Sequence, residues 1–100
     1  MAEIGRIERG LLDETPVLSL IGEFDLSNAP ELVKHFDALA DAECTRVIIE
    51  MAQMTFLDST ILGAMALAYR HGLLLEIRGA SGKVRRELDR SGLSSVFDMH

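Results

Sequence analysis

The spacing of apolar positions changes several times along the chain, and four short runs have the composition of β-strands. Residues 15–25 and 46–51 are rich in aliphatic and β-branched side chains, which is typical of strands covered on at least one face. Residues 4–9 alternate weakly and predict an edge strand, and residues 73–77 predict a further strand. Gly22 is expected to bend the strand at residues 15–25.

Three other stretches carry apolar residues at helical spacing. The helices are expected from Ser27 or Asn28 to about 41–44, from Asp58 to about Arg70, and from Lys83 to about Arg90. Pro30 suits the first turn of the first helix, and Ser81 is expected to cap the third. In the third helix Val84 and Leu88 are four residues apart and expected to point inward, and Gly92 is expected to end it. In the second helix apolar residues lie nearly all round, so neighbouring elements or a partner must cover it widely.

Strands thus alternate with helices, joined by connectors at residues 11–14 and 52–56. This order predicts an α/β fold with parallel neighbouring strands. One hundred residues suit one domain, expected to span residues 1–100. The single cysteine, Cys44, cannot form an internal disulfide, and the first residues do not resemble a signal peptide, so a cytoplasmic location is expected. The longest apolar run, residues 61–69, is about half a membrane span, so no membrane insertion is expected.

Charge argues against nucleic acid as a partner. The net charge is −6, with 48% hydrophobic and 26% charged residues. Residues 1–50 hold 11 acids against 4 bases, which is −7, and residues 51–100 hold 5 acids against 6 bases, which is +1. Because affinity for a duplex depends on neutralising phosphates, an acidic chain is poorly suited to it. The basic cluster at residues 83–90 is interpreted as a solvated helix face.

Three small polar residues separate two apolar runs in "MTFLDSTILG", residues 54–63. Asp58 is an N-cap by residue type, which places Ser59 and Thr60 in the first helical turn. Free backbone N–H groups and the helix dipole favour an anion there, so a phosphate on Ser59 is compatible with the helix. The alternative is that Asp-Ser-Thr serves only as a cap.

Other candidate constellations are weaker. Glu23 and Asp25 in "GEFD" lie on either side of Phe24 and point the same way in an extended chain. Two such carboxylates suit acid–base or metal chemistry; the alternative is a solvated strand end. "RGASGKVRR" lacks the glycine and hydroxyl spacing of a phosphate-binding loop. The three histidines and Cys44 show no metal spacing, and His71 lies about 18 Å along one helix from Ser59. No enzymatic activity, cofactor or metal is expected.

Three segments in order, "LIGEFDLSNAPEL", "VIIEMAQMTFLDSTILG" and "SGKVRRELDRSGL", resemble the STAS family of sulphate-transporter and anti-sigma-factor-antagonist domains. The resemblance covers nearly the whole chain, and the Asp-Ser-Thr segment is its most specific part. It implies one compact domain with a four- or five-stranded mixed sheet and helices packed on it. It also implies a small protein-binding module, expected as a monomer or weak dimer.

In stand-alone bacterial members of that family, a serine at the position of Ser59 is phosphorylated by a partner kinase that is itself an anti-sigma factor. The unphosphorylated form binds this partner and releases a sigma factor, and a phosphatase restores binding after phosphorylation. The resemblance therefore implies Ser59 as phosphoacceptor, with Asp25 near it. The residues expected at the phosphosite and the partner contact are Asp25, Asp58, Thr60, Ile61, Leu62 and Gly63.

The chain departs from the family pattern at two places. Ile61 stands where the motif usually has glycine, and the stretch between Gly63 and Gly72 is about four residues short. A second interpretation is therefore a non-phosphorylated STAS subunit of an ABC-type phospholipid-trafficking transport complex, which binds the ATPase of that complex. An enzyme or nucleotide-binding module is a third and weaker alternative.

Overall fold

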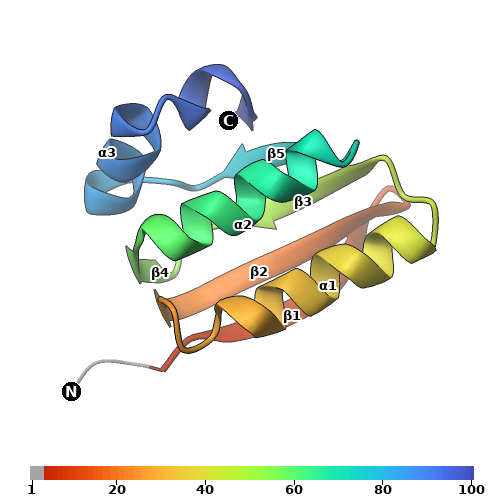
Figure 1. Ribbon diagram of the computed structural model, residues 1–100, viewed down its shortest axis with the longest axis horizontal. Helices are drawn as coiled ribbons and strands as arrows, with labels where there is room; N and C mark the ends of the chain where they lie inside the picture. Colours follow the sequence, from red (N-terminus) through yellow and green to blue (C-terminus); the bar gives the residue numbers. More distant parts are fainter. Residues whose placement is uncertain (1–3) are drawn as a thin grey trace.

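A computed structural model describes residues 4–100 and shows one mixed β-sheet with helices packed on it (Figure 1). The strands are β1 (Arg6–Leu12), β2 (Thr15–Phe24), β3 (Arg46–Glu50), β4 (Met54–Leu57), β5 (Leu74–Arg78) and β6 (Asp98–Met99). The helices are α1 (Ala29–Asp41), α2 (Ser59–Arg70) and α3 (Gly82–Arg90), followed by a 3₁₀ turn at Leu93–Ser95. The predicted α/β class is confirmed.

The sheet has the order β1-β2-β3-β5-β6, and β4 pairs with β2 beyond the end of β3. The β1–β2 pair is antiparallel and the other pairs are parallel, so the predicted mixed sheet is confirmed. Within residues 4–100 the sheet has six strands, whereas four or five were expected. The difference comes from two short strands, β4 and β6, each too short to give a periodic signal in the sequence.

The connector predicted at residues 52–56 is wrong, because most of it belongs to β4. Gly22 has φ 92° and a register shift follows it, so the end of β2 turns toward β4. Its amide donates a hydrogen bond to the carbonyl oxygen of Gln53 at 2.9 Å. The predicted bend at Gly22 is thus confirmed, and it lets one long strand pair with two shorter ones in succession.

The core lies between the sheet and the pair of helices α1 and α2, which lie over one face of it (Figure 1). The inward side chains of the central strands are fully buried, since apolar residues occupy alternate positions. They are Leu18, Leu20, Val47, Ile49, Leu75 and Ile77. The predicted range of the second helix is confirmed by α2, and Val84 and Leu88 of α3 are buried as expected.

Two predicted helix caps differ from the structure. Asn28 and Ser81 occupy the N-cap positions of α1 and α3, but neither side chain makes a capping hydrogen bond. Gly92 follows α3 in the left-handed region at φ 83°, which explains why the helix stops there. Within the described part of the chain, no helix has the length and apolar character needed to cross a bilayer.

Candidate functional site

Two acidic residues follow the ends of neighbouring strands at one edge of the sheet because of the β2–β4 register. Phe24 pairs with Leu57 in this parallel pair, so Asp25 and Asp58 follow the paired residues directly. Neighbouring strands lie about 4.8 Å apart, and parallel strands end at the same edge. The expectation that Asp25 lies near Ser59 therefore agrees with the topology, which brings the β2–α1 loop beside the start of α2 (Figure 1).

Asp58 caps α2, as its residue type predicted. Its backbone is extended, and its Oδ1 accepts hydrogen bonds from the amide of Thr60 at 2.9 Å and from that of Ile61 at 3.2 Å. Two otherwise unpaired amides of the first turn are thereby satisfied. Ser59, the first helical residue, is exposed and its amide is not used by the cap. The hydroxyl-bearing residue therefore lies at the surface on a firmly held turn.

Asp25 is held by its own loop. Its Oδ1 accepts hydrogen bonds from the amide of Ser27 at 2.8 Å and from its hydroxyl at 2.6 Å. These bonds, the hydroxyl one first, lower the pKa of Asp25 below its usual value, so the carboxylate is ionised at neutral pH. A fixed negative charge thus stands beside the start of α2.

Asn28 fixes the same loop, and this explains why its side chain does not cap α1. Its Oδ1 accepts a hydrogen bond from the amide of Asp25 at 2.9 Å, and its Nδ2 donates one to the carbonyl oxygen of Glu23 at 2.9 Å. Gly5 lies against this bridge: a Cβ at Gly5 would come within 2.5 Å of Nδ2 of Asn28. The asparagine therefore joins the end of β2 to α1 and positions Asp25.

The structure corrects two of the expected contact residues. Ile61 is 0% exposed and Leu62 is 8% exposed, because both point from α2 into the core. Neither side chain can provide the contact patch that was expected of it. Thr60 is half-buried and Gly63 is exposed, so these two remain on the accessible side of the first turns. The isoleucine at the family's glycine position therefore does not shield Ser59.

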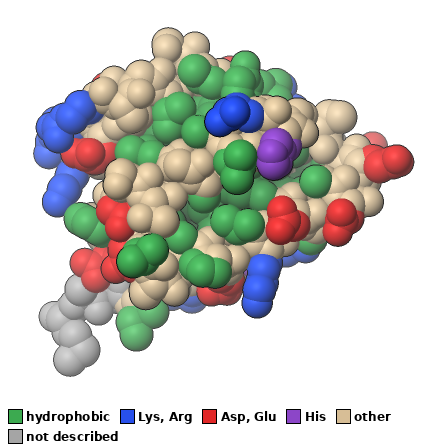
Figure 2. All heavy atoms as spheres, viewed as in Figure 1, with side chains coloured by type: hydrophobic (Ala, Val, Ile, Leu, Met, Phe, Trp, Pro, Cys, Tyr) green, Lys and Arg blue, Asp and Glu red, His purple; other side chains and the backbone are tan. Residues whose placement is uncertain are grey.

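Three residues that sequence reasoning did not single out also belong to this edge. Leu26, next to Asp25, is 72% exposed. Phe56 of β4 lies beneath the Lys83 ammonium of α3, 4.8 Å from its ring centre. Figure 2 shows hydrophobic and acidic side chains interspersed at this end of the molecule. One indication of an exposed Leu26 was present in the sequence, namely a leucine between polar residues in a loop. The contact between Phe56 and Lys83 had no such indication.

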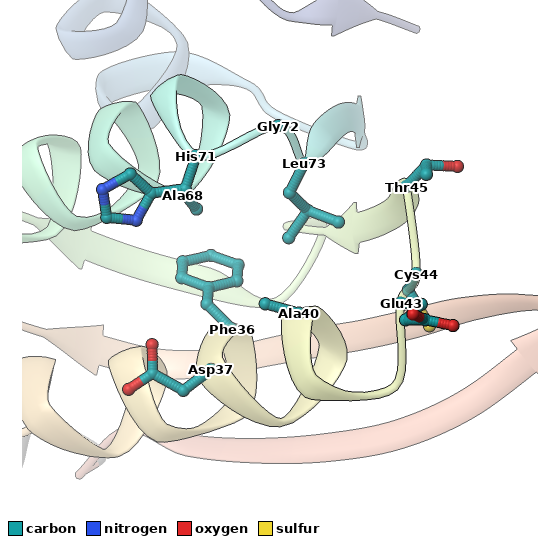
Figure 3. A pocket seen from close by; sticks show the side chains of 10 residues that line it. All are labelled: Phe36, Asp37, Ala40, Glu43, Cys44, Thr45, Ala68, His71, Gly72 and Leu73. Atoms are coloured by element: carbon teal, nitrogen blue, oxygen red, sulfur yellow. The ribbon is translucent and has the colours of Figure 1, made fainter.

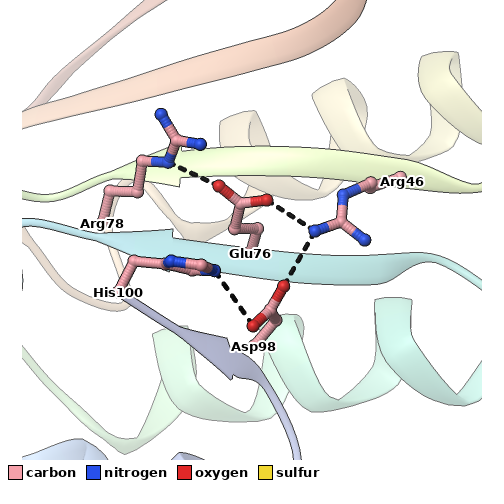
Figure 4. A network of polar contacts seen from close by, with 5 residues as sticks. All are labelled: Arg46, Glu76, Arg78, Asp98 and His100. Atoms are coloured by element: carbon pink, nitrogen blue, oxygen red, sulfur yellow. Dashed lines mark hydrogen bonds and ion pairs between the residues drawn. The ribbon is translucent and has the colours of Figure 1, made fainter.

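The residues with metal-binding chemistry lie elsewhere. Glu76, Asp98 and His100 bring ligand atoms within 4.8 Å of one another, on the side of β5 and β6 shown in Figure 4. Both oxygens of Glu76 accept from arginines, with Arg46 Nη2 at 2.5 Å from Oε1 and Arg78 Nε at 2.5 Å from Oε2. The guanidinium groups thus supply the positive charge that a cation would supply. Glu23 and Asp25 belong to no such group within residues 4–100.

Comparisons with known proteins agree with the resemblance. The protein-family model described as "Mlab, STAS domain" matches residues 7–98. A comparison with curated proteins found no match. The fold is similar to that of an anti-sigma factor antagonist from Mycobacterium paratuberculosis, with a TM-score of 0.83 and 24% identity over 97% of this chain and 86% of that one.

The anti-sigma factor antagonist SpoIIAA is similar in two forms. Its unphosphorylated form gives a TM-score of 0.63 and 18% identity over 93% of this chain and 97% of that one. Its phosphorylated form, from Bacillus, gives a TM-score of 0.67 and 21% identity over 97% of this chain and 91% of that one. At these identities the likeness establishes the fold alone, while the family model covers most of the sequence. The chain belongs to the STAS domain family.

Proposed function

We propose that this protein is an anti-sigma-factor antagonist, which binds an anti-sigma factor that is also a serine kinase while Ser59 is unphosphorylated. The observation that carries the proposal is the exposed position of Ser59 on the first turn of α2, beside the ionised Asp25 and the capping Asp58. The similar folds of proteins named anti-sigma factor antagonists support it.

The proposed switch acts through charge. The kinase transfers the γ-phosphoryl group of ATP to Oγ of Ser59: an O–P bond forms, the bond to the bridging oxygen breaks, ADP leaves, and the hydroxyl proton passes to the kinase. The product adds about −1.5 to −2 charges next to two carboxylates. A partner surface that fits a neutral hydroxyl then faces an anion for which the partner has no compensating charge. A 1,000-fold loss of affinity requires only about 4 kcal/mol. A phosphatase restores the hydroxyl by hydrolysis.

The helix itself tolerates the modification. The amide of Ser59 and the positive end of the α2 dipole face the added anion, and the core contacts of the turn are made by other residues. Phosphorylation therefore changes the surface and leaves the fold intact. This is the property required of a reversible switch.

Incubation with candidate anti-sigma factor kinases and ATP, followed by mass spectrometry, tests the proposal. One phosphoryl group is expected, located on Ser59. Thr60→Ala is the matched control for the position of the modification, because it removes the neighbouring hydroxyl and the phosphoryl group should still be found on Ser59. Ser59→Ala should bind the kinase, and Ser59→Asp should not. Normal binding by Ser59→Asp would overturn the switch.

The second candidate function is a non-phosphorylated STAS subunit of an ABC-type phospholipid-trafficking transport complex. The specific observation in its favour is the matching family model, which is described as a Mlab STAS domain. Co-purification with the ATPase of such a complex, with equal affinity for the parent chain and for Ser59→Ala, would support this candidate. Neighbouring genes that encode a permease and an ATPase, instead of a kinase and a sigma factor, would point the same way.

A further inference from the structure

A cavity of about 300 Å³ lies between the ends of α1 and α2, at the other end of α2 from Ser59 (Figure 3). Its floor is apolar and almost fully buried: Phe36 is 5% exposed, Ala68 8% and Leu73 4%. In Figure 3 the Phe36 ring stands between the two helices, with His71 on the α2 side. The volume is at the lower end of the range of small-molecule sites.

Both helices end at this cavity with the same chain reversal. After α1, Glu43 donates to the carbonyl of Ala40 and Cys44 to that of Leu39; after α2, Gly72 donates to Tyr69 and Leu73 to Ala68. Each is a Schellman motif, so each helix directs the negative end of its dipole toward the cavity. Two helices of 13 and 12 residues therefore both contribute a negative potential at this pocket, and Arg70, the base in the last turn of α2, does not line it.

Two carboxylates add to that field. Asp37 and Glu43 both line the cavity, and its lining, taken from the described residues, includes neither lysine nor arginine. Figure 2 shows acidic side chains on this end of the helical face, with hydrophobic side chains between the helices. The pocket thus combines an apolar floor with a negative rim.

Glu43 is also an unusual residue for its place. It has φ 60°, at the position where the twin motif of α2 has Gly72 with φ 100°. Left-handed backbone is strained for an L-residue and unstrained for glycine. The chain thus places a carboxylate at the rim of the cavity where glycine would give a more stable helix end.

We propose that this cavity binds a small organic cation, a primary ammonium group on a compact apolar body. The apolar part lies on Phe36, Ala68 and Leu73, and the ammonium group lies at the rim, where Asp37 and Glu43 stand on opposite sides of Phe36 and Ala40 (Figure 3). An anion is disfavoured by both carboxylates and both helix dipoles. The site is separate from the proposed phosphorylation site, because the 12 residues of α2 span about 18 Å.

Titration with 2-phenylethylamine, followed by ¹H–¹⁵N correlation spectra of the full chain, tests the proposal. Chemical-shift changes are expected at Phe36, Ala40, Ala68 and His71. The neutral 2-phenylethanol and the anionic 3-phenylpropionate are matched in size, and each should bind at least fivefold more weakly. Equal affinity for all three, or shifts that map to another surface, would overturn the proposal.

Variants separate the charge from the fold. Asp37→Asn and Glu43→Gln should each weaken amine binding at least fivefold. Asp41→Asn removes a carboxylate from the same helix end that does not line the cavity, and it should change affinity less than twofold. Glu43→Gly should weaken binding and raise the melting temperature by about 4 °C. Unchanged affinity in both Glu43 variants would overturn the assignment.

Discussion

Arg46 and Glu76 form an ion pair across β3 and β5, with Nη2 2.5 Å from Oε1, and the same Nη2 lies 2.8 Å from Oδ2 of Asp98 (Figure 4). Glu76 is 4% exposed, so its charge depends on these partners. One guanidinium thus links three strands, including the two-residue strand β6 that has few backbone hydrogen bonds of its own.

Replacing Arg46 with methionine should destabilise the protein by about 1–3 kcal/mol, because the buried Glu76 carboxylate loses one of its two arginine partners. Urea unfolding gives the free energy. Arg90→Ala is the control, since its pair with Glu87 is exposed on the arginine side and should contribute at most about 1 kcal/mol. Equal effects of the two substitutions would contradict this account of Glu76.

Stability should fall in acid partly through the same network. Hydrogen bonds from Arg46 and then Arg78 lower the pKa of Glu76, and those from His100 and then Arg46 lower the pKa of Asp98. A carboxylate with a lowered folded-state pKa contributes stability above its unfolded pKa and loses it as pH falls through the folded value. The contribution should therefore be complete at pH 7 and decline below about pH 5.

The measurement is the difference in unfolding free energy between the parent chain and Glu76→Gln, followed from pH 7 into acid. This difference isolates Glu76 from other carboxylates with a lowered pKa, such as Asp89, whose pKa falls through hydrogen bonds from Ser94 and Arg85. The two curves should converge as pH falls. A constant separation would show that ionisation of Glu76 does not contribute.

Asp58→Ala should destabilise the protein by about 1 kcal/mol, because two first-turn amides lose their acceptor. Asp58→Asn keeps a capping oxygen and should stay within a few tenths of a kcal/mol of the parent. Thermal or urea unfolding separates the two. The asparagine variant also removes a charge beside Ser59, so Asp58→Asn combined with Ser59→Asp should bind the proposed kinase more tightly than Ser59→Asp alone.

Leu26→Ser should weaken binding to the proposed anti-sigma factor at least tenfold, which is about 1.4 kcal/mol, without loss of stability. Leu26 is a large apolar side chain that is 72% exposed next to Asp25, so covering it with a partner would remove apolar surface from water. Leu11→Ser is the matched control: Leu11 is 75% exposed against 72% for Leu26, but it lies at the opposite edge of the sheet. Titration calorimetry measures the affinity, and an equal loss of affinity in both variants would exclude a specific role for Leu26.

The features that the sequence predicted well depend on local chemistry. The start of α2 follows from the cap-forming Asp58, and its end precedes Gly72, which has φ 100°. The inward pair Val84 and Leu88 follows from helical spacing in a short, otherwise polar helix. In each case the residues that decide the structure lie within one or two turns of each other.

The features that were missed depend on residues distant in sequence. Strand β4 exists because Gly22 turns β2 toward it, and β6 because it pairs with β5 and is bound by Arg46. Asn28 appeared free to cap α1, but the loop from Glu23 to Asp25 uses its side chain. Apolar residues all round α2 left open which of them face the core, so Ile61 was expected at the surface.

Ile61 has a fully enclosed side chain one residue after the first-turn pair Ser59 and Thr60. Unwinding that turn would expose an isoleucine, at a cost of about 1.5–3 kcal/mol. The first turn of α2 is therefore rigid, and a group attached to it keeps one position and orientation. A charged group added there would change the electrostatic potential that a partner meets at a fixed position, without a conformational change in the rest of the domain.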